Sequence, residues 1–103
     1  MRFEKEGDRL ILLIDTDLTA NRVKEIVDEA KRRVAQQGEY DKLVIDLTRV
    51  QYIDSTGISF IIGLYKSTCG NGKNFRLTGL NEDLLGLFRL MKLDKIFDMS
   101  AAG

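Results

Sequence analysis

The stretch LVIDLTRVQYIDSTGI, residues 43–58, decides the fold of this chain. It opens with an apolar run that ends in Asp46, a pattern typical of a strand that is covered on both faces. It closes with Asp54-Ser55-Thr56-Gly57, directly before a second apolar run. The three polar residues of this tetrad are all favourable helix N-cap types, and glycine permits close backbone approach. The stretch therefore predicts a buried strand, a loop and a helix that begins beside a small hydroxyl group.

The start of a helix is a favourable place for negative charge. Its first backbone N–H groups have no intrahelical partners, and its dipole attracts anions. The chain would therefore tolerate a phosphate group added to a hydroxyl at this place. On spacing alone, however, simple capping by Asp54 and Ser55 is the more common explanation, because serine caps are frequent.

The composition is that of one soluble domain. The chain has 103 residues, of which 44% are hydrophobic and 31% are charged, and sixteen basic residues balance sixteen acidic ones. This balance gives no overall field that would recruit nucleic acid or a membrane surface. There is no signal-peptide pattern and no bilayer-spanning apolar run, and Cys69 is the only cysteine. We therefore expect a single domain over residues 1–103, located in the reducing cytoplasm and not inserted in a membrane.

The sequence contains few of the residue patterns that are typical of enzyme active sites. It contains no histidine, which is the most common general base and metal ligand, so a catalytic triad with an imidazole is excluded. Asp46 and Asp54 lack a third carboxylate at useful spacing. Residues 70–73 lack the spacing of a phosphate-binding loop and precede a strand. We therefore expect no catalytic residue, no cofactor and no metal ion.

Hydrophobic periodicity predicts an α/β domain with a mixed sheet. The first two strands, residues 2–6 and 9–14, form a hairpin around Gly7-Asp8. A strand, an amphipathic helix and a further strand imply parallel neighbours with a right-handed crossover. The expected strands are residues 2–6, 9–14, 42–47, 75–78 and 94–98, and the expected helices are residues 19–38, 56–68 and a third one capped by Asn81.

Four residues carry further expectations about packing. Phe88 and Met91 belong to the predicted apolar face of the third helix, so both are expected in the core. Cys69 is expected in the core or at its boundary. Asp46, at the end of its strand, is expected to accept hydrogen bonds from backbone N–H groups of the following loop.

Residues 44–47 and 52–58 resemble the signature of the STAS domain, and within that family the bacterial anti-sigma factor antagonists. The resemblance continues through residues 63–66, 75–80 and 87–97 and is weak before residue 40. It implies the STAS fold, which is an α/β fold with a single mixed four- to five-stranded sheet and three main helices in the order β-β-α-β-α-β-α-β.

The resemblance also implies a function, which is partner switching. In these antagonists the serine that follows the aspartate is phosphorylated by a partner kinase, and Ser55 aligns with it. The implied partners are an anti-sigma factor that is also a serine kinase, from which a sigma factor is released, and a serine phosphatase that resets the switch. Apart from phosphorylation at Ser55, the expected partner-binding residues are Asp17, Thr19, Tyr52, Asp54, Ser55, Thr56, Gly57 and Ile58.

The chain departs from the family pattern at two places. Residues 16–19 lack the glycine of the family's Gly-x-Leu-Asp motif, which leaves the identity of the partner open. A further helix that often follows the last strand in the family has no counterpart in residues 99–103. Two alternatives also stay open: a STAS subunit of a lipid-transport complex or stress-sensing scaffold, and an enzyme or nucleotide-binding domain.

Overall fold

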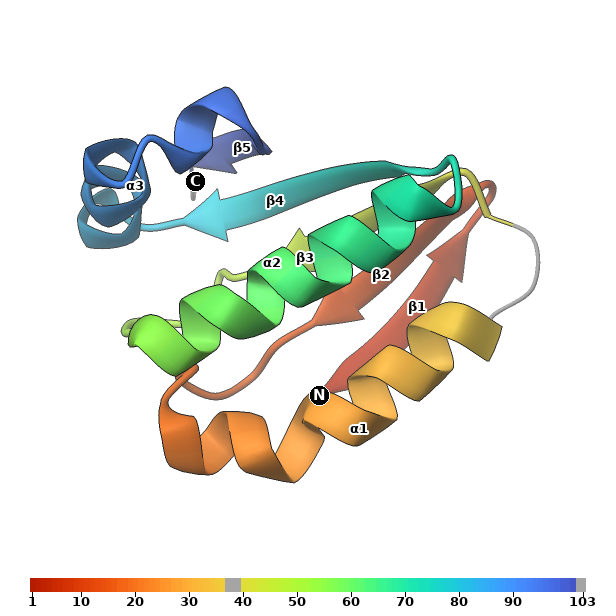
Figure 1. Cartoon of the computed structure of the whole chain (residues 1–103), viewed down its shortest axis with the longest axis horizontal. Coiled ribbons are helices and arrows are strands. Elements are labelled where there is room, and N and C mark those ends of the chain that lie inside the picture. Colours follow the sequence, from red (N-terminus) through yellow and green to blue (C-terminus); the bar gives the residue numbers. More distant parts are fainter. Residues whose placement is uncertain (37–39, 102–103) are drawn as a thin grey trace.

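A computed structural model describes residues 1–36 and 40–101 as one five-stranded sheet with helices packed on it (Figure 1). The strands follow one another across the sheet in chain order, and only the first pair is antiparallel. The elements are β1 (Arg2–Glu6), β2 (Arg9–Leu13), α1 (Ala20–Gln36), β3 (Lys42–Asp46), α2 (Ser55–Gly70), β4 (Asn74–Leu80), α3 (Glu82–Leu90), the 3-10 helix η1 (Leu93–Lys95) and β5 (Asp98–Ala101). This confirms the predicted mixed sheet, its element order and the crossover connections.

The core lies between the sheet and the pair of helices α1 and α2, which run side by side over one face (Figure 1). Alternation along the strands shows which face this is. Leu10 and Leu12 of β2 are buried, whereas their neighbours Ile11 and Leu13 are half-buried. Successive strand residues point to opposite faces, so β2 is fully covered on only one of its two faces.

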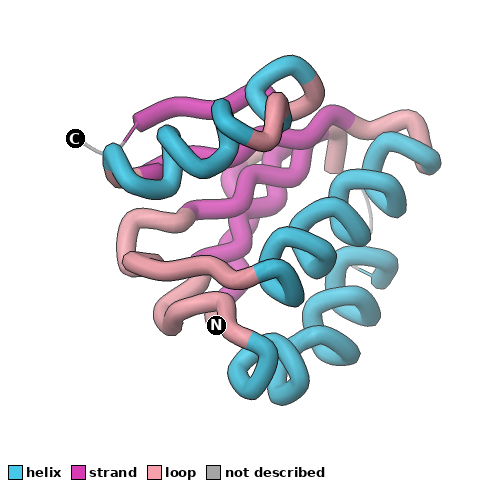
Figure 2. Tube along the Cα trace, turned by 60° about the vertical axis from the view of Figure 1, so that its left-hand side comes forward, coloured by secondary structure: helices cyan, strands magenta, loops and turns pink. Residues whose placement is uncertain are grey.

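The parallel register aligns the carboxyl ends of β2 and β3 at the same end of the sheet, beside Thr78 of β4. Leu13 pairs with Asp46, and Asp46 pairs with Thr78. The loops after β2 and β3, residues 14–19 and 47–54, therefore leave the sheet at the same end, where Figure 2 shows them together beside the starts of α1 and α2. Asp46 Oδ1 accepts from Thr48 N at 2.9 Å, which confirms its expected role at the start of the second loop.

The last part of the chain differs from the prediction. The strand predicted at residues 94–98 is wrong: Leu93–Lys95 form η1, and the last strand, β5, is Asp98–Ala101. The reason is that Leu93 and Phe97 are both buried, and Phe97 N donates to Leu93 O at 2.8 Å, which is the spacing of a helical turn. Phe97 then completes a cluster of aromatic rings with Tyr65, Phe75 and Phe88, with ring centroids 5.2 to 6.2 Å from its own.

Three smaller expectations are also corrected. Met91 is exposed, because α3 ends at Leu90 and the left-handed backbone of Lys92 (φ 60°) turns the chain away. Cys69 is exposed in the last turn of α2. The helix predicted from Thr56 to Thr68 runs from Ser55 to Gly70. The predicted end of the first helix near Gly38 lies outside the described residues.

Candidate functional site

The candidate site is the N-terminal end of α2. Asp54 is its N-cap residue, with extended backbone angles, and Asp54 Oδ1 accepts from Gly57 N at 2.9 Å. Ser55 is the first helical residue and is exposed to solvent. Thr56, expected at the first helical position, is the second. The cap therefore places Ser55 on the surface, directly after Asp54 in the chain.

The second oxygen of the Asp54 carboxylate has a different partner. Asp54 Oδ2 accepts from Ala20 N, the first residue of α1, at 2.8 Å. One carboxylate therefore holds the N-termini of both helices. The hydrogen bond from Gly57 N is the largest cause that lowers the pKa of Asp54; burial opposes it, and the bond from Ala20 N adds to the lowering.

Asp17 joins the same two loops from the other side. Its Oδ1 accepts from Gln51 N at 2.9 Å and from Tyr52 N at 3.3 Å. An isolated parallel bridge between Leu18 and Ile53 runs alongside. Its hydrogen bonds are Leu18 N to Tyr52 O at 3.0 Å and Asp54 N to Leu18 O at 3.2 Å. The loop of residues 14–19 is thus fixed to the loop that presents Ser55.

Gly57 is required by this packing. A Cβ atom at Gly57 would lie 2.2 Å from Leu18 O and 2.8 Å from Leu18 Cβ. Contacts this short do not occur in folded proteins, so any side chain would force the first loop away from α2. The expectation that Gly57 permits close approach is confirmed: the loop after β2 approaches it through Leu18, and the loop before α2 approaches it through Ile53 Cγ2, 2.7 Å from the same Cβ position.

The predicted partner-binding residues fall into two groups. Tyr52, Ser55 and Thr56 are exposed, with 58% of Tyr52 accessible, and they form the outer surface of the site. The other predicted residues are less exposed. Asp17, Thr19 and Asp54 are half-buried. Gly57 and Ile58 are buried, and Ile58 has 5% of its surface accessible. The side chain of Ile58 therefore supports the surface from beneath.

Sequence reasoning places Asp17 and Thr19 of the first loop in this site, but it misses that Leu18 and Ala20 contact Asp54. Leu18 and Ala20 contact Asp54 through their own backbone atoms, and Ala20 lies 34 positions before Asp54 in the sequence. Only the N-cap bond from Gly57, three residues away, has a local signature. The residue type at positions 18 and 20 gives no signal of these contacts.

Neither a metal centre nor a membrane span is found in residues 1–36 and 40–101. These residues contain no group of three or more cysteine, aspartate and glutamate side chains placed to hold a metal ion. Within the same ranges no helix combines the length and the apolar character needed to cross a bilayer.

Comparison with known proteins defines the family. The family model of the STAS domain matches residues 1–102. The chain belongs to the STAS domain family. Among curated relatives of this STAS protein is an "Anti-sigma-B factor antagonist" of Listeria monocytogenes, 32% identical over 99 residues, covering 93% of this chain and 82% of the relative.

Solved structures show the same fold. An anti-sigma-factor antagonist (STAS) domain protein from Planctomyces limnophilus matches with a TM-score of 0.84 at 15% identity, covering 99% of this chain and 90% of the other. The anti-sigma factor antagonist SpoIIAA in its unphosphorylated form matches with a TM-score of 0.77 at 16% identity, covering 97% and 86%. In its phosphorylated form it matches with a TM-score of 0.72 at 16% identity, covering 97% and 89%. These likenesses confirm the STAS fold that the sequence resemblance implies.

Proposed function

We propose that this STAS protein is an anti-sigma factor antagonist that acts by partner switching, with Ser55 as its phosphoacceptor. The observation that carries the proposal is the exposed Ser55 hydroxyl at the first position of α2, on a surface fixed by Asp54 and Asp17. Unphosphorylated, the protein binds an anti-sigma factor that is also a serine kinase. That partner phosphorylates Ser55 with ATP, and a serine phosphatase removes the phosphate.

In this proposal the protein acts in the cytoplasm as a ligand and a substrate, not as an enzyme. The partner contacts Tyr52, Ser55 and Thr56 directly, since these three side chains are exposed. Asp17, Thr19 and Asp54 shape the surface through the hydrogen bonds and packing of the two loops. Gly57 and Ile58 contribute from the interior.

A phosphate on Ser55 would act by blocking this surface. It adds about −1.5 to −2 charges and three acceptor oxygens beside the carboxylate of Asp54. In the free protein the charge faces solvent at a helix N-terminus, which stabilises it. Within a packed interface the same group would be desolvated and unpaired, and a loss of about 1.4 kcal/mol already reduces affinity tenfold. No change of fold is needed.

The test is binding of Ser55→Asp and Ser55→Ala to the kinase purified from the native host by its activity on Ser55. We expect Ser55→Asp to bind at least about tenfold more weakly than the parent and Ser55→Ala to bind like it. Ser67→Asp adds the same charge to an exposed position of α2 twelve residues later, about 18 Å along the axis, and should bind normally. Tight binding by Ser55→Asp would refute the blocking mechanism.

A further inference from the structure

A hollow lies at the corner where the open face of the sheet meets the loops after β2 and β3. It has a volume of about 320 Å³, within the range of small-molecule sites. Its lining residues come from β1, from the ends of β2 and β3, and from both loops: Arg2, Leu13, Ile14, Asp15, Asp46, Thr48 and Arg49. The half-buried Leu13 makes its accessible apolar side, with Ile14 buried behind it, and the other residues supply a few polar groups.

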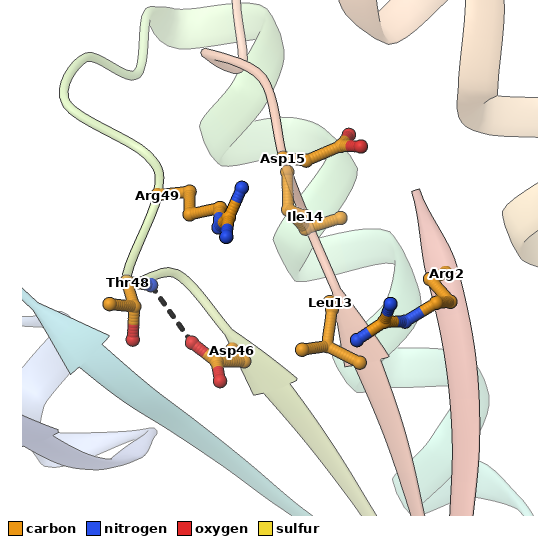
Figure 3. A pocket seen from close by; sticks show the side chains of 7 residues that line it. All are labelled: Arg2, Leu13, Ile14, Asp15, Asp46, Thr48 and Arg49. Carbon is orange, nitrogen blue, oxygen red and sulfur yellow. Dashed lines mark hydrogen bonds between the residues drawn. The ribbon is translucent and has the colours of Figure 1, made fainter.

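Two arginines face each other across this hollow. Figure 3 shows Arg49, from the loop after β3, and Arg2, from β1, directed from opposite sides toward the space beside Leu13 and Asp46. Arg2 pairs with Glu4 at 2.9 Å and has further N–H donors. Arg49 has no hydrogen-bond or ion-pair partner among the described residues.

The carboxylates of the hollow are already engaged. Asp15 accepts from the Met1 amino group at 2.7 Å, and this contact is the main cause that lowers the pKa of Asp15. Asp46 uses Oδ1 for Thr48 N, and Oδ2 has no partner among the described residues. The groups left to meet a ligand are therefore the guanidinium of Arg49, the remaining donors of Arg2 and one acceptor oxygen of Asp46.

We propose that this hollow binds a small free oxyanion that also carries a hydroxyl group, such as a phosphate ester of a small alcohol or a hydroxy acid. The planar forks of Arg49 and Arg2 match the oxygens of a phosphate or a carboxylate. Asp46 Oδ2 accepts from the hydroxyl of the ligand. Leu13 contacts its carbon atoms. Because Arg49 belongs to the loop that ends at Asp54, the bound anion also ties that loop to β1.

The proposal is tested by titrating the full chain with sn-glycerol 3-phosphate and following the amide signals of Thr48 and Arg49 and the side-chain signal of Arg49 by NMR. We expect saturable shifts with a dissociation constant on the order of millimolar. Arg49→Gln and Arg2→Gln should each weaken binding about tenfold. Arg22→Gln, an exposed arginine of α1 that does not line the hollow, should bind like the parent.

Two further titrations identify the chemistry. Inorganic phosphate should shift the same signals but bind more weakly, because it lacks the carbon atoms and the hydroxyl. Asp46→Asn keeps an oxygen for Thr48 N but loses the free acceptor, so it should reduce the preference for glycerol 3-phosphate over phosphate. Shifts that rise linearly without saturation, or that are equal in Arg49→Gln and Arg22→Gln, would overturn the proposal.

Discussion

At the residue scale the site depends on how each aspartate uses its oxygens. Asp54 uses both, one for Gly57 N in α2 and one for Ala20 N in α1. Asp17 uses only Oδ1, which accepts from both Gln51 N and Tyr52 N. The two side chains look equivalent in the sequence, but only Asp54 requires a carboxylate.

Replacement by asparagine separates the two roles. Asp17→Asn keeps the one acceptor oxygen, so its free energy of unfolding should stay close to that of the parent. Asp54→Asn keeps the cap on α2, because asparagine caps as well as aspartate, but it places an NH2 group against Ala20 N–H. We expect a clearly lower free energy of unfolding in urea for Asp54→Asn. Equal stability of the two variants would contradict the double cap.

The same carboxylate predicts a dependence on pH. The hydrogen bond from Gly57 N holds the pKa of Asp54 below its usual value of 3.8. A group whose pKa is lowered by folding stabilises the fold fully above its unfolded pKa and loses this effect as the pH falls through its folded pKa. The stability gap between the parent and Asp54→Asn should therefore be constant at neutral pH and narrow below about pH 3.8. Urea titrations across this range measure it.

Gly57 gives a second prediction at this scale. Gly57→Ala places a Cβ atom 2.2 Å from Leu18 O and should cost about 2–3 kcal/mol of unfolding free energy. Gly63→Ala lies in the same helix, and there the nearest atom outside the helix is Lys31 Cε at 4.0 Å. It should stabilise the protein by up to about 1 kcal/mol, because alanine favours helices. Thermal unfolding of both variants shows whether the loss at Gly57 comes from the clash with Leu18 or whether α2 tolerates no glycine-to-alanine substitution at all.

At the scale of elements, the sequence predicts what is encoded locally. The strand before Asp46, the amphipathic α1, the Asp54 cap and the Asn81 cap all rest on patterns of a few residues, and the structure confirms them. The prediction for the segment after α3 is wrong, because Leu93 and Phe97 reach the core through a helical turn and not through a strand. A short apolar pair at this spacing does not distinguish a strand from a turn. The contact of Asp54 with Ala20 depends on the packing of two distant loops and has no local pattern.

The aromatic cluster tests this assignment of the last elements. Phe97 has 4% of its surface accessible and packs against three other rings, whereas its neighbour Ile96 has 52% accessible. Phe97→Ala should lower the free energy of unfolding by about 3–5 kcal/mol. Ile96→Ala should change it by less than about 0.5 kcal/mol. A comparable loss in both variants would show that Ile96 is also part of the core.

At the scale of the whole molecule, size explains why a single phosphate on Ser55 would suffice to block a partner. The molecule measures 33 × 27 × 24 Å, and the loops and the start of α2 lie at one end of its long axis (Figure 1). A standard protein interface covers about 800 Å² on each partner, which is comparable to this entire end. A partner that docks on Tyr52 and Thr56 therefore also covers Ser55 and cannot avoid a phosphate there.

The most direct test of partner switching is to locate the phosphate by mass spectrometry after incubating the protein with ATP and soluble extract of its native host. We expect phosphate on Ser55, none on the neighbouring Thr56, and no modification of α2 in Ser55→Ala. Unmodified Ser55, in an extract whose kinase activity is verified on another substrate, would contradict partner switching and favour a role in a lipid-transport complex or a scaffold.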